Sequence, residues 1–298
     1  MLSEVLGQRT AVEFLTGVIK NNNVAHAYLF YGPPSVGKHT TARAFAKALL
    51  CESSDPHKRP CGECRHCHKF RKKVHPDLLE IEPAGAQLKI EQIRQLKKDL
   101  RYGPLESKWK VVIVNGADHL AAPAANSFLK LLEEPTPGVV LILLTISATS
   151  LLPTIRSRCQ PVQFSLLNDQ DLTQVLNKSN SLPQEQIAAA VNYSQGMVAE
   201  AVLLAQPEVQ TLLQELSTNT FSTIFQANSM ASKLLEYKDE LSGILGAYLK
   251  ICAEDSRAEL SLVLETISSL RYNVNQLLLL ETFLLKLGEK RLERVAAR

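Results

Sequence analysis

The sequence predicts an α/β fold with a mostly parallel, five-stranded sheet, followed by an all-helical C-terminal region. Short apolar runs alternate with stretches of helical periodicity through the first 165 residues. A glycine-rich, phosphate-binding pattern separates the first apolar run from the helix after it. Strand patterns end before Asn168, and the periodicity is helical from there on. The alternation indicates parallel strands with helices on both faces of the sheet.

The first elements in chain order are a helix, a strand and a second helix. The first helix is expected within residues 2–20, where apolar side chains recur every three or four positions, although Gly7 and Gln8 interrupt its start. Residues 27–31 predict the first strand. After Lys38, an apolar stripe at helical spacing predicts a helix whose N-terminus faces the preceding loop. That arrangement is the one that anion binding requires.

The loop between this strand and helix resembles the phosphate-binding pattern G-x-x-x-x-G-K-[ST]. Gly32, Gly37 and Lys38 are present, so backbone N–H groups could surround phosphate oxygens while the lysine reaches the outer phosphates. His39 occupies the hydroxyl position, and imidazole is a poor ligand for Mg²⁺. Thr40 lies one residue on, about 100° around the helix. We expect weak or vestigial binding of ATP or ADP by Gly32, Gly37, Lys38 and Thr40; the alternative is a plain glycine-rich turn.

Four cysteines follow the second helix with the spacing C-x₉-C-x₂-C-x₂-C: Cys51, Cys61, Cys64 and Cys67. Four thiolates close a tetrahedral zinc site, and a closed site is structural rather than catalytic. An iron–sulfur cluster is an alternative, and a nearby histidine could replace one ligand. Lysines and arginines surround the cysteines within residues 58–73, which indicates either a solvated basic face or a DNA-phosphate patch.

The next strand, residues 77–81, precedes a helix at residues 90–100 and a fully apolar strand at residues 110–114. In a P-loop ATPase the end of that last strand carries an acidic pair for Mg²⁺ and water. Asn115 and Gly116 stand there instead, and Asp118 comes three residues after Asn115. The catalytic half of the nucleotide site is therefore expected to be incomplete at two places.

A helix at residues 124–134 ends before Pro135, and strands are expected at residues 139–145 and 161–164. Arg158 precedes the final strand, with no acidic residue beside it in sequence; it is either a surface residue or a functional one. Residues 168–206 predict two or three short helices, and residues 207–298 predict a larger helical region.

Composition sets bounds on the function. The 298 residues exceed one ordinary domain, and a net charge of +3 is too small to indicate nucleic-acid binding by itself. The N-terminus does not resemble a signal peptide, and the longest apolar stretch is too short to span a membrane. We expect a cytoplasmic protein without membrane association, in which clustered cysteines bind metal more often than they form disulfides.

Together these residues resemble the bacterial DNA polymerase III clamp-loader family, and within it the delta-prime branch. The matching segments are residues 26–30 (HAYLF) with the phosphate loop, the four-cysteine insert, residues 125–135 (ANSFLKLLEEP) and residues 157–159 (SRC). They cover most of residues 1–160. The departures at His39, at Asn115 and Gly116, and at Ala199, where ATPase members carry a lid arginine, favour the delta-prime branch over the gamma/tau motors.

The resemblance implies an AAA+ P-loop domain at residues 1–165 with a zinc insert at 51–75, a helical lid at 166–206 and a helical collar at 207–298. It implies a hetero-pentamer with gamma/tau and delta subunits that loads the sliding clamp onto primed DNA in the replisome at the bacterial nucleoid. In that ring this chain would be a non-hydrolysing stator, and Arg158 would act in trans as an arginine finger at a neighbour's ATP site.

Two alternatives remain at this point. A working gamma/tau-type ATPase would use Lys38 with relaxed metal chemistry, and turnover by the isolated chain would reveal it. A zinc-dependent DNA-binding protein would use the basic insert, and strongly salt-dependent DNA affinity without partners would support it.

Overall fold

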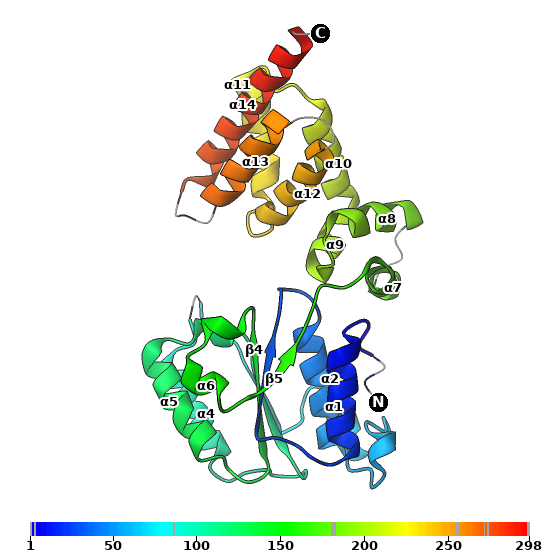
Figure 1. Ribbon diagram of the computed structural model, residues 1–298, viewed down its shortest axis with the longest axis vertical. Coiled ribbons are helices and arrows are strands. Elements are labelled where there is room, and N and C mark those ends of the chain that lie inside the picture. The colour runs from blue at the N-terminus through cyan, green and yellow to red at the C-terminus, as the bar shows by residue number, and fades with distance from the viewer. Residues whose placement is uncertain are drawn as a thin grey trace. The chain divides into compact units, whose positions relative to one another are not determined.

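The computed structural model describes residues 2, 4–85, 87–179, 183–253, 257–270, 272 and 274–296. Its contacts divide the chain into two compact units, Met1–Leu167 and Asn168–Arg298. The first unit is a sheet flanked by helices and the second is entirely helical in its described residues (Figure 1). None of the described helices combines the length and the apolar character that a bilayer-spanning segment needs.

The sheet of the first unit has five strands in the order β2-β3-β4-β1-β5, and every pairing is parallel. Its strands are β1 (Ala27–Tyr31), β2 (Leu78–Ile81), β3 (Lys110–Val114), β4 (Val139–Thr145) and β5 (Gln160–Gln163). The chain continues from β1 to β2 on one side of the sheet and later places β5 on the other side of β1, so the switch point of the sheet lies beside β1. Tyr28 of β1 pairs with Ile142 of β4 on one side and with Gln160 of β5 on the other. In open parallel sheets, ligands bind at the carboxyl ends of strands beside such a switch point.

Helices cover both faces of this sheet, as the buried apolar strands require. They are α1 (Arg9–Lys20), α2 (Lys38–Leu50), α4 (Ile90–Leu100), α5 (Ala122–Glu133) and the short α6 (Pro153–Arg156). Side chains alternate along each strand, so Ala27 and Leu29 face α4 and α5, whereas Tyr28 faces α2 and meets Phe45 with ring centroids 5.2 Å apart.

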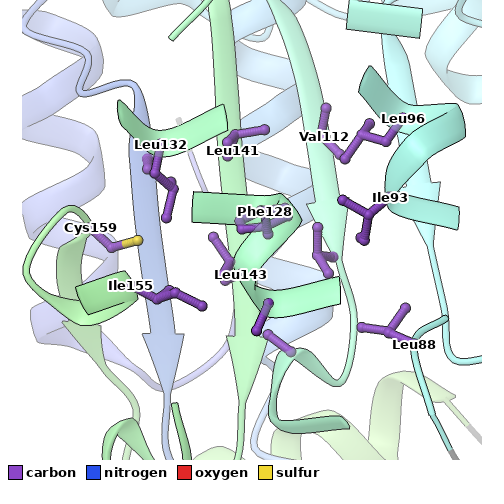
Figure 2. Close-up of a cluster of buried hydrophobic side chains, with 14 of the residues drawn as sticks. Leu88, Ile93, Leu96, Val112, Phe128, Leu132, Leu141, Leu143, Ile155 and Cys159 are labelled. Carbon is purple, nitrogen blue, oxygen red and sulfur yellow. The ribbon is translucent and has the colours of Figure 1, made fainter. Parts of the chain in front are cut away.

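The core on the α4 and α5 side is a single apolar cluster. Figure 2 shows Phe128 of α5 and Ile93 of α4 directed at Leu141 and Leu143 of β4 and at Val112 of β3. Each of these five side chains is at most 2% exposed. This packing fixes the sheet and therefore the strand ends that carry the candidate site.

The second unit consists of helices only, in its described residues. They are α7 (Asp169–Ser179), α8 (Gln184–Tyr193), α9 (Val198–Leu204), α10 (Pro207–Thr218), α11 (Ile224–Leu235), α12 (Leu241–Ala253), α13 (Arg257–Ser269) and α14 (Gln276–Ala296). A buried polar network joins three of them: Tyr248 donates to Glu259 at 3.0 Å, and Arg291 donates to the Tyr248 hydroxyl at 2.6 Å. Burial raises the pKa of the Tyr248 hydroxyl, so it remains a neutral donor.

The expected fold class is confirmed: a parallel five-stranded sheet with a helical C-terminal region. The first helix begins at Arg9 rather than near residue 2, because Gly7 and Gln8 both have positive φ. The division of the helical region into a lid and a collar near residue 206 stays a prediction. The structure also contains α3 (Arg65–Arg71) inside the cysteine insert, a helix that the sequence pattern does not indicate.

Candidate functional site

The phosphate loop lies between the carboxyl end of β1 and the start of α2, beside the switch point of the sheet. Gly32 has φ +149°, and a Cβ there would lie 2.2 Å from the carbonyl oxygen of Phe164. Gly37, with φ +93°, precedes α2 directly. Both positions require glycine, and the loop therefore has the backbone of an anion cradle at the N-terminus of a 13-residue helix.

Lys38 is the charged residue of this cradle. Its Nζ donates to the carbonyl oxygens of Gly32 at 2.7 Å and Pro33 at 2.5 Å. Burial lowers the pKa of the ammonium group, and the charge of Asp118 partly opposes this effect. The lysine is thus folded onto the loop, in position to receive a phosphate.

His39, at the position where a hydroxyl would bind Mg²⁺, makes a different contact. Its Nε2 lies 3.3 Å from a carboxylate oxygen of Glu80 on β2, and the other oxygen of Glu80 accepts from Arg43. Thr40 is exposed, and the hydroxyl that bonds to the loop is that of the buried Thr41, which donates to the Gly37 carbonyl oxygen at 2.8 Å. Position 39 therefore offers a cation in the cradle no hydroxyl, and a role for Thr40 in binding nucleotide stays a prediction.

The end of β3 has no carboxylate at Asn115 or Gly116, and the chain turns there through Gly116 at φ +61° into a short 3₁₀ helix (Ala117–His119). That turn brings Asp118 within electrostatic range of Lys38. The Asp118 Oδ1 is buried and has no hydrogen-bond partner among the described residues. The sequence spacing gives Asp118 no role in the site, but in the structure its negative charge acts on Lys38.

The four predicted zinc ligands come together in the insert that follows α2. The Sγ atoms of Cys51, Cys61, Cys64 and Cys67 all lie within 4.8 Å of one another, with Cys51 and Cys61 3.6 Å apart. A tetrahedral site with Zn–S bonds near 2.3 Å separates its sulfurs by about 3.8 Å. Backbone N–H groups of Glu63 and Cys64 lower the pKa of Cys61 to about 7, toward the thiolate form that binds metal. Burial raises the pKa values of the Cys51 and Cys67 thiols, which a bound cation would oppose. The residues present therefore fit a four-thiolate metal ion.

Histidines near the cluster do not join it. His66 and His75 are buried and bonded to each other, with 2.9 Å between Nδ1 and Nε2. His75 Nδ1 accepts from the Asp77 N–H at 3.1 Å, and His66 Nε2 lies 3.5 Å from Glu52. This chain of contacts ties the insert to the start of β2.

Asp77 is itself the centre of a polar network. Its carboxylate accepts from the N–H groups of Leu105, Glu106 and Ser107 and from the Ser107 hydroxyl, at 2.6 to 3.0 Å. Burial alone would raise the pKa of Asp77, but these hydrogen bonds outweigh burial and the pKa is lowered.

Replacing Asp77 by Asn should cost about 2 kcal/mol of stability at pH 7, because hydrogen bonds to a charged acceptor are lost. A folded-state pKa below the unfolded value contributes stability that is full above about pH 4 and disappears as the pH falls through the folded pKa. The variant should therefore lose less stability than the wild type between pH 5 and pH 3.

Urea unfolding followed by the fluorescence of Trp109, the single tryptophan, measures this effect close to the network. The exposed Asp99, replaced by Asn, is the matched control. Equal acid sensitivity of wild type and Asp77→Asn would contradict the assignment.

Arg158 follows α6 and precedes β5. Its Nη2 forms an ion pair with Glu133 at the end of α5, at 2.9 Å, and its Nη1 donates to the Thr154 carbonyl oxygen at 3.0 Å. The arginine is 37% exposed and the glutamate 48%. No neighbour in sequence indicated this partner, which lies 25 residues earlier and is brought close by the packing of α5 against α6.

Comparisons with known proteins agree on one family. A family model described as DNA polymerase III, delta subunit, matches residues 7–168. DNA polymerase III subunit delta' of Bacillus subtilis is 35% identical over 199 residues, which are 67% of this chain and 59% of that protein. The delta' subunit of Haemophilus influenzae is 32% identical over 57% of this chain and 52% of its own length.

A gamma subunit and a gamma subunit-related protein are also similar to this chain. DNA polymerase III subunit gamma of Buchnera aphidicola is 31% identical over 68% of this chain and 57% of its own length. The chain thus spans less than two thirds of each of these relatives. A solved structure of a gamma subunit-related protein from Thermotoga maritima matches 93% of this chain and 98% of its own, with TM-score 0.56 and 20% identity. That likeness shows that the two chains share a fold.

Proposed function

The chain belongs to the DNA polymerase III delta subunit family, and from that membership we propose that it is a clamp-loader subunit of the delta-prime kind. In this role it binds nucleotide weakly and does not hydrolyse it. The observation that carries the proposal is a phosphate cradle that keeps Gly32, Gly37 and Lys38 but has His39 bonded to Glu80 where a metal ligand belongs.

The partners follow from the family. We propose that gamma/tau and delta subunits join this chain in a hetero-pentamer, which loads the sliding clamp onto primed DNA in the cytoplasm, at the replisome. The motors hydrolyse ATP, and this chain supports them as a stator. Arg158 is the residue that would take part in their chemistry. Its guanidinium would stabilise charge on the γ-phosphate bound by a neighbouring subunit.

Zinc has a structural role in this proposal. Cys51, Cys61, Cys64 and Cys67 would hold one ion and leave it no open coordination position, so that its contribution is to fold the insert. The buried pair His66 and His75 then links that insert to Asp77 at the start of β2.

The isolated chain should not turn over ATP with Mg²⁺ at a measurable enzymatic rate. Position 39 supplies no oxygen ligand for the cation, and neither Asn115 nor Gly116 supplies a carboxylate to position water. The steady-state rate of phosphate release should therefore stay well below roughly 1 s⁻¹, the lower end of typical kcat values for enzymes.

The variant Lys38→Ala is the control, because it removes the cradle's cation and leaves any contaminating activity unchanged. A wild-type rate of about 1 s⁻¹ or more that Lys38→Ala abolishes would identify a motor of the gamma/tau type instead. The similarity to gamma subunits makes that the second candidate function.

A further inference from the structure

Gln8 adopts a backbone conformation that a non-glycine residue rarely takes. Its φ is +52°, it follows Gly7 at φ +67°, and it stands immediately before α1. Residues held in this region cost free energy and are concentrated at sites where the strain serves a function. A side chain at this position would ordinarily cap the helix, but the amide of Gln8 is directed instead at two distant segments.

The first segment is the phosphate loop and the second is the backbone just after β5. Gln8 Nε2 donates to the carbonyl oxygen of Val36 at 3.1 Å and to that of Ser165 at 2.5 Å. Gln8 Oε1 accepts from the Ser165 N–H at 3.1 Å. One half-buried side chain therefore satisfies three backbone groups and joins the loop to residue 165.

An independent contact joins the same two segments at the other end of the loop. The Phe164 N–H donates to the Tyr31 carbonyl oxygen at 2.8 Å, and the Phe164 carbonyl oxygen lies where a Cβ of Gly32 would be. Phe164 thus contacts the loop at Gly32, near its start, and Ser165 is linked through Gln8 to Val36, near its end. They lead through Leu167 to Asn168, where the second unit of the chain begins.

We propose that Gln8 is a positioning residue that couples occupancy of the phosphate loop by a nucleoside diphosphate to the backbone of residues 164–167. A bound phosphate competes with the Gly32 and Pro33 carbonyl oxygens for the Lys38 ammonium group, so the loop backbone must adjust when the phosphate arrives. Because Val36 and Ser165 share the Gln8 amide, the adjustment reaches residue 165. The inference rests on the proposed weak binding of nucleotide.

Hydrogen–deuterium exchange of the full chain, with and without ADP, tests the coupling, and calorimetry gives the ADP affinity. In the wild type, ADP should slow amide exchange in residues 35–38 and also in residues 164–167. In Gln8→Ala, exchange at residues 164–167 should be about tenfold faster, and ADP should still protect the loop but change residues 164–167 much less than in the wild type. A residue that only stabilises the fold would leave the ADP response at 164–167 intact.

Two further variants sharpen the test. Gln8→Glu keeps the acceptor for the Ser165 N–H but places a carboxylate oxygen against the carbonyl oxygens of Val36 and Ser165. It should therefore behave like Gln8→Ala without a loss of side-chain volume. The same variant serves as the test if Gln8→Ala does not fold. Arg9→Ala, an exposed neighbour, should match the wild type. Normal ADP binding with an unchanged response at 164–167 in the Gln8 variants overturns the coupling alone. Failure of the wild type to bind ADP overturns the coupling together with the proposed nucleotide site.

Discussion

Replacing Cys64 by serine should abolish zinc binding and unfold residues 51–75. Binding free energy in structural zinc sites is folding free energy, about 10–16 kcal/mol in zinc-finger peptides at neutral pH. Cys64 has a second structural role, since its sulfur accepts from the Cys67 N–H and caps α3. Serine is a preferred N-cap residue and can keep this hydrogen bond, so the substitution isolates the loss of the metal ligand.

The measurements are metal content by elemental analysis and proteolysis of the insert. Wild-type protein purified without chelator should contain one zinc per chain, and Cys64→Ser much less than one, with new cleavage confined to residues 51–75. Cys159→Ser removes a buried thiol outside the cluster and should retain the metal. Substoichiometric zinc in the wild type, or full zinc in Cys64→Ser, would show that the four thiolates are not a zinc site.

Replacing Arg158 by alanine should lower ATP hydrolysis at one neighbouring motor site of the assembled complex by about 10³ to 10⁵, the effect of an arginine finger in other phosphate-cleaving enzymes. The chain itself should fold normally, because the ion pair with Glu133 is half-exposed and such pairs contribute about 1 kcal/mol or less. In the proposed pentamer the other ATP sites would keep arginines supplied by other subunits. The total rate of the complex should therefore fall only in part, with a larger loss in clamp loading.

Glu133→Gln is the matched control for this experiment. It breaks the same ion pair but leaves the guanidinium, so it should preserve hydrolysis and loading while having the same effect on stability. If the Arg158→Ala complex loads clamps at the wild-type rate, Arg158 is a surface residue and the trans role is wrong. If Glu133→Gln loses as much activity as Arg158→Ala, the ion pair matters and the guanidinium does not act on a neighbour.

Much of the first unit could be predicted from sequence because its strands are continuous apolar runs. Residues 110–114 and 139–145 form strands with the expected bounds, since a strand buried on both faces leaves little ambiguity in the pattern. The helix α3 could not be predicted in this way. Its seven residues are mostly charged or polar, and its formation depends on the Cys64 cap and on the packing of Phe70 beneath Arg43.

The candidate site was predictable where one segment supplies several groups, as in the phosphate loop and the cysteine cluster. It was not predictable where the chain brings distant residues together. Asp118 reaches Lys38 only because Gly116 turns the backbone, Glu133 meets Arg158 across two helices, and Gln8 contacts Ser165 over 157 residues. A pattern within a single segment carries no information about contacts of this kind.

The position of β1 also determines when the first unit can form during synthesis. The strand is completed at Tyr31, but both of its neighbours come much later, and the pairing of Tyr31 with Gln163 closes a separation of 132 residues. At about 5–20 residues per second the ribosome takes roughly 10 s to supply the missing strands. During that interval an apolar strand with free edges is exposed on the nascent chain, which makes it a substrate for the cell's chaperones before it pairs with β4 and β5.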